Sequence, residues 1–243
     1  MKNAKRLLTA CIALALMLSS GPATAGMGRQ GAGVIMEMLH LHSLMNHGLE
    51  MIAEGSNIVM FSQSQTIPPL DEMTLEHGRK MIKEGEAVIE RVLKGPEIKL
   101  VLKAGHGNDP SVRDLRELGN AELSFARLAE KLGEAGQGGR KTRHIRVLID
   151  HTLVMAAQGS DLVITGQMKM TDTDAYSIEH GRMMLFDSRS LLSSVKGMEL
   201  DKVNAKDGAM ARTVAAGKTA GKIIDLLDKM AGQGNTPTMS MSE

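Results

Sequence analysis

Cysteine and aromatic residues are nearly missing from this 243-residue chain. Its single cysteine is Cys11, and it has three phenylalanines, one tyrosine and no tryptophan. One cysteine excludes an intramolecular disulfide and a cysteine-based zinc site, and without Cys-x-x-Cys-His haem cannot be attached covalently. The scarcity of rings leaves a core of aliphatic side chains and of the 20 methionines, which adapt to irregular gaps.

An excess of positive charge is also missing. The chain has 29 lysines and arginines against 28 aspartates and glutamates, for a formal net charge of +1. The basic residues form no block that would track a phosphate backbone, so we expect no nucleic-acid partner.

The N-terminus has the composition of a secretory signal. Three basic residues (Lys2, Lys5 and Arg6) precede an apolar run over residues 7–18, and Ala23-Thr24-Ala25 supplies a small-x-small cleavage site. We predict that residues 1–25 are a signal peptide and that the mature protein is periplasmic or secreted. The apolar run is too short to span a bilayer, so no stable membrane anchor is expected after cleavage. Cleavage also removes Cys11.

Strand signals are nearly absent, whereas Ala, Leu, Met, Glu and Lys favour helix. The fold class predicted is therefore all-α. The expected helices cover about 33–62, 70–94, 110–132, 141–166, 173–195 and 207–231, with Pro68-Pro69, Asp109-Pro110 and a glycine-rich stretch at 133–139 among the breaks.

A ten-residue pattern occurs four times, at 46–55, 76–85, 150–159 and 179–188. Its common form is polar–His–(Gly/Thr)–x–x–Met–x–x–(Glu/Gln/Asp)–(Gly/Ser). A helix turns by about 100° per residue, which places the Met about 40° and the acid or amide about −20° from the His. Each of four helices is therefore expected to carry one stripe of an imidazole, a thioether and an oxygen donor beside a small residue.

The pattern belongs to a larger duplication. His40, His47 and His77 recur as His144, His151 and His180, at offsets of 104, 104 and 103 residues. We interpret residues 26–138 and 139–231 as two copies of a three-helix unit, fused into one domain and followed by a disordered tail at 232–243. Two His-bearing helices cannot bury their own apolar faces, so we expect the four to form an antiparallel core. The helices at 110–132 and 207–231 lack the pattern and are expected to be accessory.

Metal binding is the first functional interpretation of the stripe. Imidazole suits copper, zinc and nickel, and thioether selects Cu(I), so a chain without cysteine would hold copper through His and Met. We expect the four imidazoles to point inward with the methionines beside them. The predicted metal ligands are His47, Met51, His77, Met81, His151, Met155, His180, Met184, His40 and His144.

Three other interpretations stay open. In the first, the glycines serve only for close helix contacts, with Met and His filling the seam between helices. In the second, the stripe binds a b-type haem, and in the third, a Met-rich groove makes the protein a scaffold for a partner helix. No Ser-His-Asp or Cys-His constellation is readable, so we do not expect an enzyme. His42 and His106 have no counterparts in the repeat and are not expected to be ligands.

The sequence His-Gly-x-x-Met-x-x-x-Gly, repeated behind a secretory signal, resembles the small periplasmic metal-binding proteins built from repeated His-bearing helical turns. The resemblance covers 46–55, 76–85, 150–159 and 179–188 only. It implies metal binding in the periplasm, without assigning individual ligands.

Overall fold

A computed structural model describes residues 28–62, 68–103, 109–134, 139–168, 172–197 and 208–233. The chain divides into two compact units, residues 1–35 and 36–243. The predicted signal peptide and the tail beyond residue 233 lie outside the described ranges. The following paragraphs concern the second unit, which contains helices from both copies of the repeat.

The described residues are helical almost throughout, which confirms the all-α prediction. The helices agree closely with those expected from the sequence, and a short additional helix, α4, was not predicted. They are α2 (Gly28–Ser62), α3 (Pro68–Lys94), α4 (Pro96–Lys103), α5 (Pro110–Glu134), α6 (Arg140–Gln167), α7 (Asp174–Gly197) and α8 (Gly208–Gln233).

Proline begins three of the helices, and a side-chain cap is present at the start of α5. Pro68, Pro96 and Pro110 each occupy the first position of a helix, where the missing N–H costs no hydrogen bond. At the start of α5, the backbone N–H of Ser111 donates to Asp109 Oδ1 at 2.8 Å, which is an N-cap contact. The break before Pro96 is therefore what separates α4 from α3.

Small residues of the repeat bring α2 against α3 and α6 against α7. A Cβ atom placed on Gly55 would lie 2.6 Å from the carbonyl oxygen of Gly78, and one on Gly85 would lie 2.6 Å from that of Gly48. In the second copy, the corresponding contact joins Gly159 and Gly181. The packing interpretation of these glycines is confirmed, because no larger side chain fits between the backbones. We call these contacts the α2–α3 seam and the α6–α7 seam.

Polar contacts between α2 and α6 join the two halves. His42 Nε2 lies 3.3 Å from the Ser160 hydroxyl, and Arg146 donates to the Ser56 hydroxyl at 3.0 Å. His42 and Arg146 are 104 residues apart, as are Ser56 and Ser160. Such a reciprocal pair is what an approximate two-fold axis between α2 and α6 would produce. The duplication itself remains an interpretation of the sequence.

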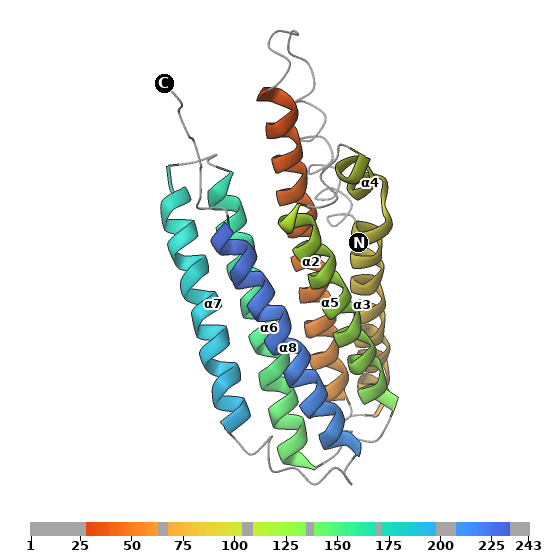
Figure 1. The fold of residues 1–243 in the computed structure, drawn as a ribbon. Coiled ribbons are helices and arrows are strands. Elements are labelled where there is room, and N and C mark those ends of the chain that lie inside the picture. Colours follow the sequence, from red (N-terminus) through yellow and green to blue (C-terminus); the bar gives the residue numbers. More distant parts are fainter. Residues whose placement is uncertain are drawn as a thin grey trace. The chain divides into compact units, whose positions relative to one another are not determined.

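Residues 110–132 and 207–231, which were expected to be accessory helices, contribute completely buried side chains, and the expected antiparallel four-helix core is not confirmed. Phe125 and Leu118 of α5 and Ile223 and Leu227 of α8 are completely buried. α8 packs against α5, α6 and α7, and α5 also contacts α3 (Figure 1). The seams close only one face of each helical hairpin, so α5 and α8 are needed to cover the apolar side chains that remain.

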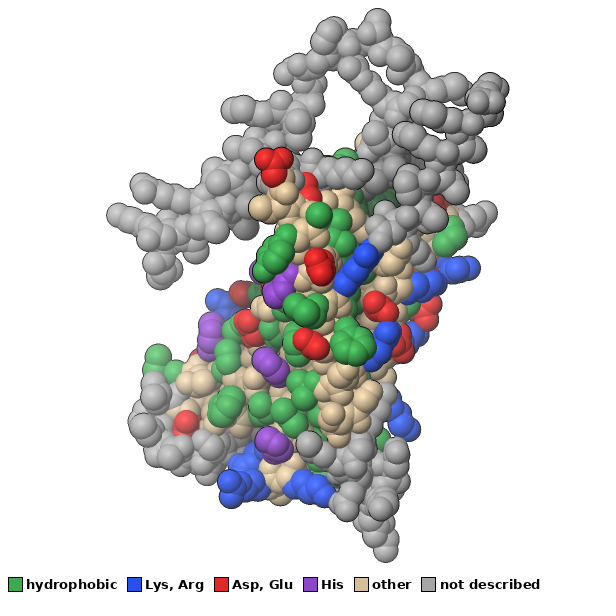
Figure 2. All heavy atoms as spheres, turned by 90° about the vertical axis from the view of Figure 1, so that its left-hand side faces the viewer, with side chains coloured by type: hydrophobic (Ala, Val, Ile, Leu, Met, Phe, Trp, Pro, Cys, Tyr) green, Lys and Arg blue, Asp and Glu red, His purple; other side chains and the backbone are tan. Residues whose placement is uncertain are grey.

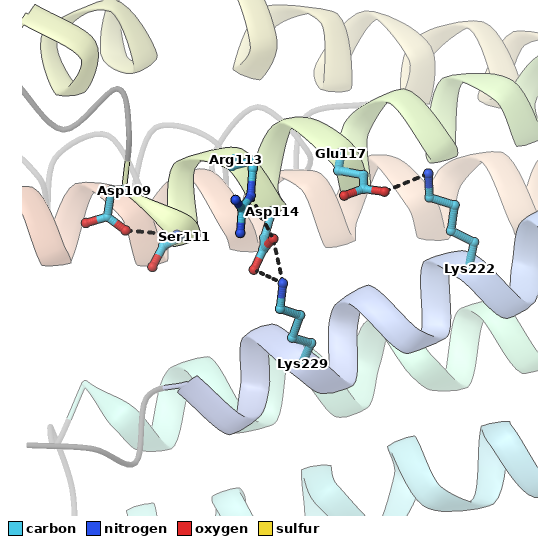
Figure 3. A network of polar contacts seen from close by, with 7 residues as sticks. All are labelled: Asp109, Ser111, Arg113, Asp114, Glu117, Lys222 and Lys229. Atoms are coloured by element: carbon cyan, nitrogen blue, oxygen red, sulfur yellow. Dashed lines mark hydrogen bonds and ion pairs between the residues drawn. The ribbon is translucent and has the colours of Figure 1, made fainter.

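Ion pairs tie α5 to α8 along their exposed edges (Figure 3). The Lys229 ammonium lies 2.7 and 2.8 Å from the two carboxylate oxygens of the buried Asp114, and Lys222 lies 2.8 Å from Glu117. The Asp114 pair is partly desolvated, so it is expected to matter more for stability than the exposed Glu117 pair.

The N-terminal half of α6 carries a completely buried charged pair. Arg146 Nε is 3.0 Å from Asp150 Oδ1, and the guanidinium lies 4.5 Å from the centre of the Phe125 ring. Burial raises the pKa of Asp150 to about 6, although the neighbouring Arg146 charge opposes the shift. α6 is long and apolar enough to span a bilayer, but core helices meet the same criterion, and over half of its apolar window is buried inside the protein.

The carboxyl of Glu122 in α5 is buried without a hydrogen-bond partner in the described part of the chain. The side chain is completely buried, and neither of its oxygens accepts a hydrogen bond there. Burial raises the pKa of Glu122 well above its usual range.

We predict that Gly55→Ala destabilises the protein by about 1–3 kcal/mol, because the added methyl group overpacks the α2–α3 seam. Gly33→Ala is the control, because a Cβ atom at this position meets nothing within 4 Å. This substitution should raise the free energy of unfolding by less than about 1 kcal/mol. Urea denaturation followed by circular dichroism measures both. Equal stability of Gly55→Ala and wild type would contradict the close approach.

We predict that Glu122→Met raises the free energy of unfolding by about 1–3 kcal/mol near pH 7, because it removes an unpaired buried acid. The folded pKa is raised, so the cost of Glu122 grows as pH rises above the unfolded value of 4.5. The gain should therefore be larger near pH 7 than near pH 4. Denaturation at both pH values tests this, with the exposed Glu76→Met as control. A loss of stability in Glu122→Met would show that the carboxyl has a partner.

Candidate functional site

The prediction that His47, His77, His151 and His180 point inward is wrong for three of the four. The side chains of His40, His47, His77, His144 and His151 are exposed, and only His180 is half-buried. The glycine that follows His47, His77 or His180 faces the neighbouring helix, so the histidine itself lies about 100° further round. This rotation carries the imidazole out of the contact and to the edge of the seam.

The repeat methionines lie closer to the helix contacts than the histidines do. Met51, Met81, Met155 and Met184 are all half-buried. The Met51 Cβ would be 3.1 Å from a Cβ atom on Gly85, and the Met184 Cβ would be 2.9 Å from one on Gly159. The thioethers therefore follow the solvent-facing side of the two seams.

Antiparallel pairing determines how the stripe is arranged along each seam. Because Gly48 meets Gly85 and Gly55 meets Gly78, the middle of the α2–α3 contact falls near residues 51 and 81. The two methionines are thus at the centre, and the two histidines lie one helical turn away towards opposite ends. Figure 2 shows the face on the α7 side, where histidine side chains stand among hydrophobic and acidic ones.

A groove of about 440 Å³ lies where α2, α6 and α7 meet. Two of the predicted ligands, His180 and Met184, form its α7 wall, and Glu50 comes from α2. Its other lining residues, Gln158, Asp161, Leu162 and Thr165, come from α6. We call this the acidic groove, because two carboxylates face an imidazole and a thioether there.

The charge of Asp161 disfavours the ionisation of Glu50 in the acidic groove. Burial, together with the charges of Asp161 and Glu54, raises the pKa of Glu50 to about 7, against a hydrogen bond from Gln158. Burial also raises the pKa of Asp161, while hydrogen bonds from Asn46 and Ser43 and the nearby His47 oppose the shift. Two partly desolvated acids of like charge form an environment that a bound cation would stabilise.

Asn46 positions one of these carboxylates. Its side chain is completely buried, and its Nδ2 donates to Asp161 Oδ1 at 2.8 Å. This hydrogen bond from a buried amide orients the Asp161 carboxylate, which could act as a metal ligand.

The structure brings only part of the predicted site together. His180 and Met184 line one groove, and His47 lies close enough to affect Asp161. The other predicted ligands are spread along the two seams. Among the described residues, no group of three or more His, Cys, Asp or Glu side chains is close enough to hold a metal ion. Any site must therefore use Met or amide donors, or require side chains to move.

Sequence reasoning missed the acidic residues of the groove. Glu50 and Gln158 lie within the ten-residue pattern, and Asp161 follows it by two positions. Val154 occupies the position of Glu50 in the second copy, so a comparison of the two copies does not identify Glu50 as a shared residue. Only the packing of α2 on α6 brings Glu50 to Asp161.

His42 was not expected to be a ligand, and its surroundings agree with a structural role. It is buried against Ser160, and burial lowers the pKa of His42 to about 4. The imidazole is therefore neutral near pH 7. His106 lies outside the described residues.

No protein-family model, curated protein or solved structure matches this chain. The functional argument therefore depends on the residues of the site.

Proposed function

We propose that the mature protein binds a soft or borderline metal cation, Cu(I) foremost, and buffers or delivers it in the periplasm. The observation that carries the proposal is the acidic groove, which His180 and Met184 of the repeat line together with Glu50 and Asp161. These side chains supply a nitrogen, a sulfur and oxygen donors on three different helices.

The donor set suits copper for chemical reasons. Thioether is a soft neutral ligand that prefers Cu(I), and imidazole binds copper in either oxidation state. The carboxylates add negative charge, which a cation would offset where Glu50 and Asp161 now repel each other. Met184 and His180 would bind the metal directly, Asp161 would complete or neutralise the site, and Asn46 would hold Asp161 in place.

A half-buried groove also suits buffering or delivery. A site at the surface lets a metal enter and leave without opening the core, whereas structural sites are closed. The metal would then be cargo, which the protein passes on to another carrier.

We predict that His180→Ala and Met184→Leu each weaken Cu(I) binding at least about tenfold, or about 1.4 kcal/mol. Competition titrations under anaerobic conditions measure the affinity. Met183→Leu is the matched control, because Met183 is the adjacent methionine and does not line the groove. Its affinity should equal that of the wild type.

Two results would contradict this assignment. Wild-type protein that binds neither Cu(I) nor Zn²⁺ more tightly than about 10 μM has no metal function at this site. Tight haem uptake with a Soret band, unaffected by Met184→Leu, would replace the proposal with a b-type haem protein.

We predict that Cu(I) affinity falls as pH decreases below about 7, by up to tenfold per unit. The pKa of Glu50 is raised to about 7, so protons compete with the metal just below neutrality. Glu50→Gln removes this competition and should flatten the pH dependence between about pH 6 and pH 8, leaving only the part due to imidazole. Titrations of both proteins across this range test the prediction. Identical slopes would exclude Glu50 from the site.

A further inference from the structure

Most of the aromatic residues of this chain lie on its surface. Phe125 is buried, but Phe61, Tyr176 and Phe186 are exposed, although aromatic side chains usually contribute to cores. Two of the three, Tyr176 and Phe186, belong to α7, together with the exposed Met183. Their exposed fractions are 71%, 68% and 53% for Tyr176, Phe186 and Met183.

These three side chains form a single row along α7. The spacings from Tyr176 to Met183 and from Met183 to Phe186 are seven and three residues, as at positions a, a and d of a heptad. The opposite side of α7 packs on the bundle through Gly181, Leu185 and Ser188, which are buried. α7 is the helix at the left-hand edge of Figure 1.

The first copy of the repeat carries only the first member of such a row, because the counterpart of Tyr176 is the exposed Met73. At an offset of 103 residues, the counterparts of Met183 and Phe186 on α3 are Lys80 and Lys83, both exposed. Lysine at these positions is what a solvated helix face requires. The same fold therefore tolerates charge there, and the apolar row on α7 needs another explanation than folding.

We propose that this face of α7 is a dimer interface with a second copy of the chain, the two α7 helices running parallel about a two-fold axis. Exposed aromatic and Met side chains are typical of interface centres. In such a pair, Met183 and Phe186 of one protomer pack against the same residues of its partner.

Charge selects the parallel arrangement. Arg182 and Asp187 flank the row at positions g and e, five residues apart. In a parallel pair, position g of one helix faces position e of the other. Arg182 of each protomer therefore faces Asp187 of its partner, which gives two equivalent ion pairs. In an antiparallel pair, g faces g and e faces e, which brings like charges together.

Glu179 limits the strength of the interface. It occupies the d position between Tyr176 and Met183 and is exposed, so two glutamates would meet across the axis. We therefore expect a reversible dimer with a dissociation constant in the micromolar range, on the order of 10 μM.

Sedimentation velocity of the mature protein over a concentration series tests the proposal. Met183→Lys combined with Phe186→Lys copies the residues of α3 and should abolish the dimer. Met73→Lys is the control, because Met73 is equally exposed on α3 and should leave the dimer unchanged. Circular dichroism establishes that each variant is folded, as expected for substitutions at exposed positions.

Two further variants distinguish this interface from any other. Glu179→Leu completes the apolar row and should tighten the dimer at least about tenfold. Asp187→Arg should weaken it, and adding Arg182→Asp should restore it, because the exchanged charges face each other again.

A wild-type protein that stays monomeric up to about 200 μM overturns the proposal. So does a dimer that survives the double lysine variant. Binding of the monomer to vesicles of anionic phospholipid, lost in the same variant, would show that the row is a membrane contact instead. None of these results depends on metal binding.

Discussion

The close approach of helices at small residues constrains the rest of this structure. Where Gly55 meets Gly78, and Gly159 meets Gly181, the backbones come too near for any side chain to lie between them. Such contacts determine which residues of the ten-residue pattern turn towards the neighbouring helix. The histidine before Gly48, Gly78 or Gly181 therefore lies at the edge of the seam, and two of these three histidines, His47 and His77, are exposed.

Buried polar groups determine how the two helical hairpins meet. The His42–Ser160 and Arg146–Ser56 contacts join α2 to α6 in register, since a shift along the helices would leave these groups without partners. Arg146 also lies over the Phe125 ring and forms an ion pair with Asp150, and these contacts further restrict the arrangement of α2 and α6. Buried pairs of this kind add little net stability, and a role in fixing one arrangement of the bundle agrees with their position.

The acidic groove is a consequence of that register. Glu50 and Asp161 come from different halves of the chain and meet because α2 packs on α6, while α7 adds His180 and Met184 through the α6–α7 seam. The two halves therefore differ in chemistry although their backbones are arranged alike. A similar divergence separates the exposed lysines of α3 from the apolar row of α7.

The sequence alone determined the helical class, the boundaries of the long helices and the recurrence of a small residue after the histidine of each ten-residue pattern. These features are local, since proline, caps and helical periodicity act over a few residues. Tertiary structure decided which way the stripe faces, because a 100° rotation separates a contact from an edge and only the neighbouring helix selects between them. It also placed α5 and α8 in the core and brought Glu50 to Asp161, 111 positions away, because burial and ionisation depend on which helices become neighbours.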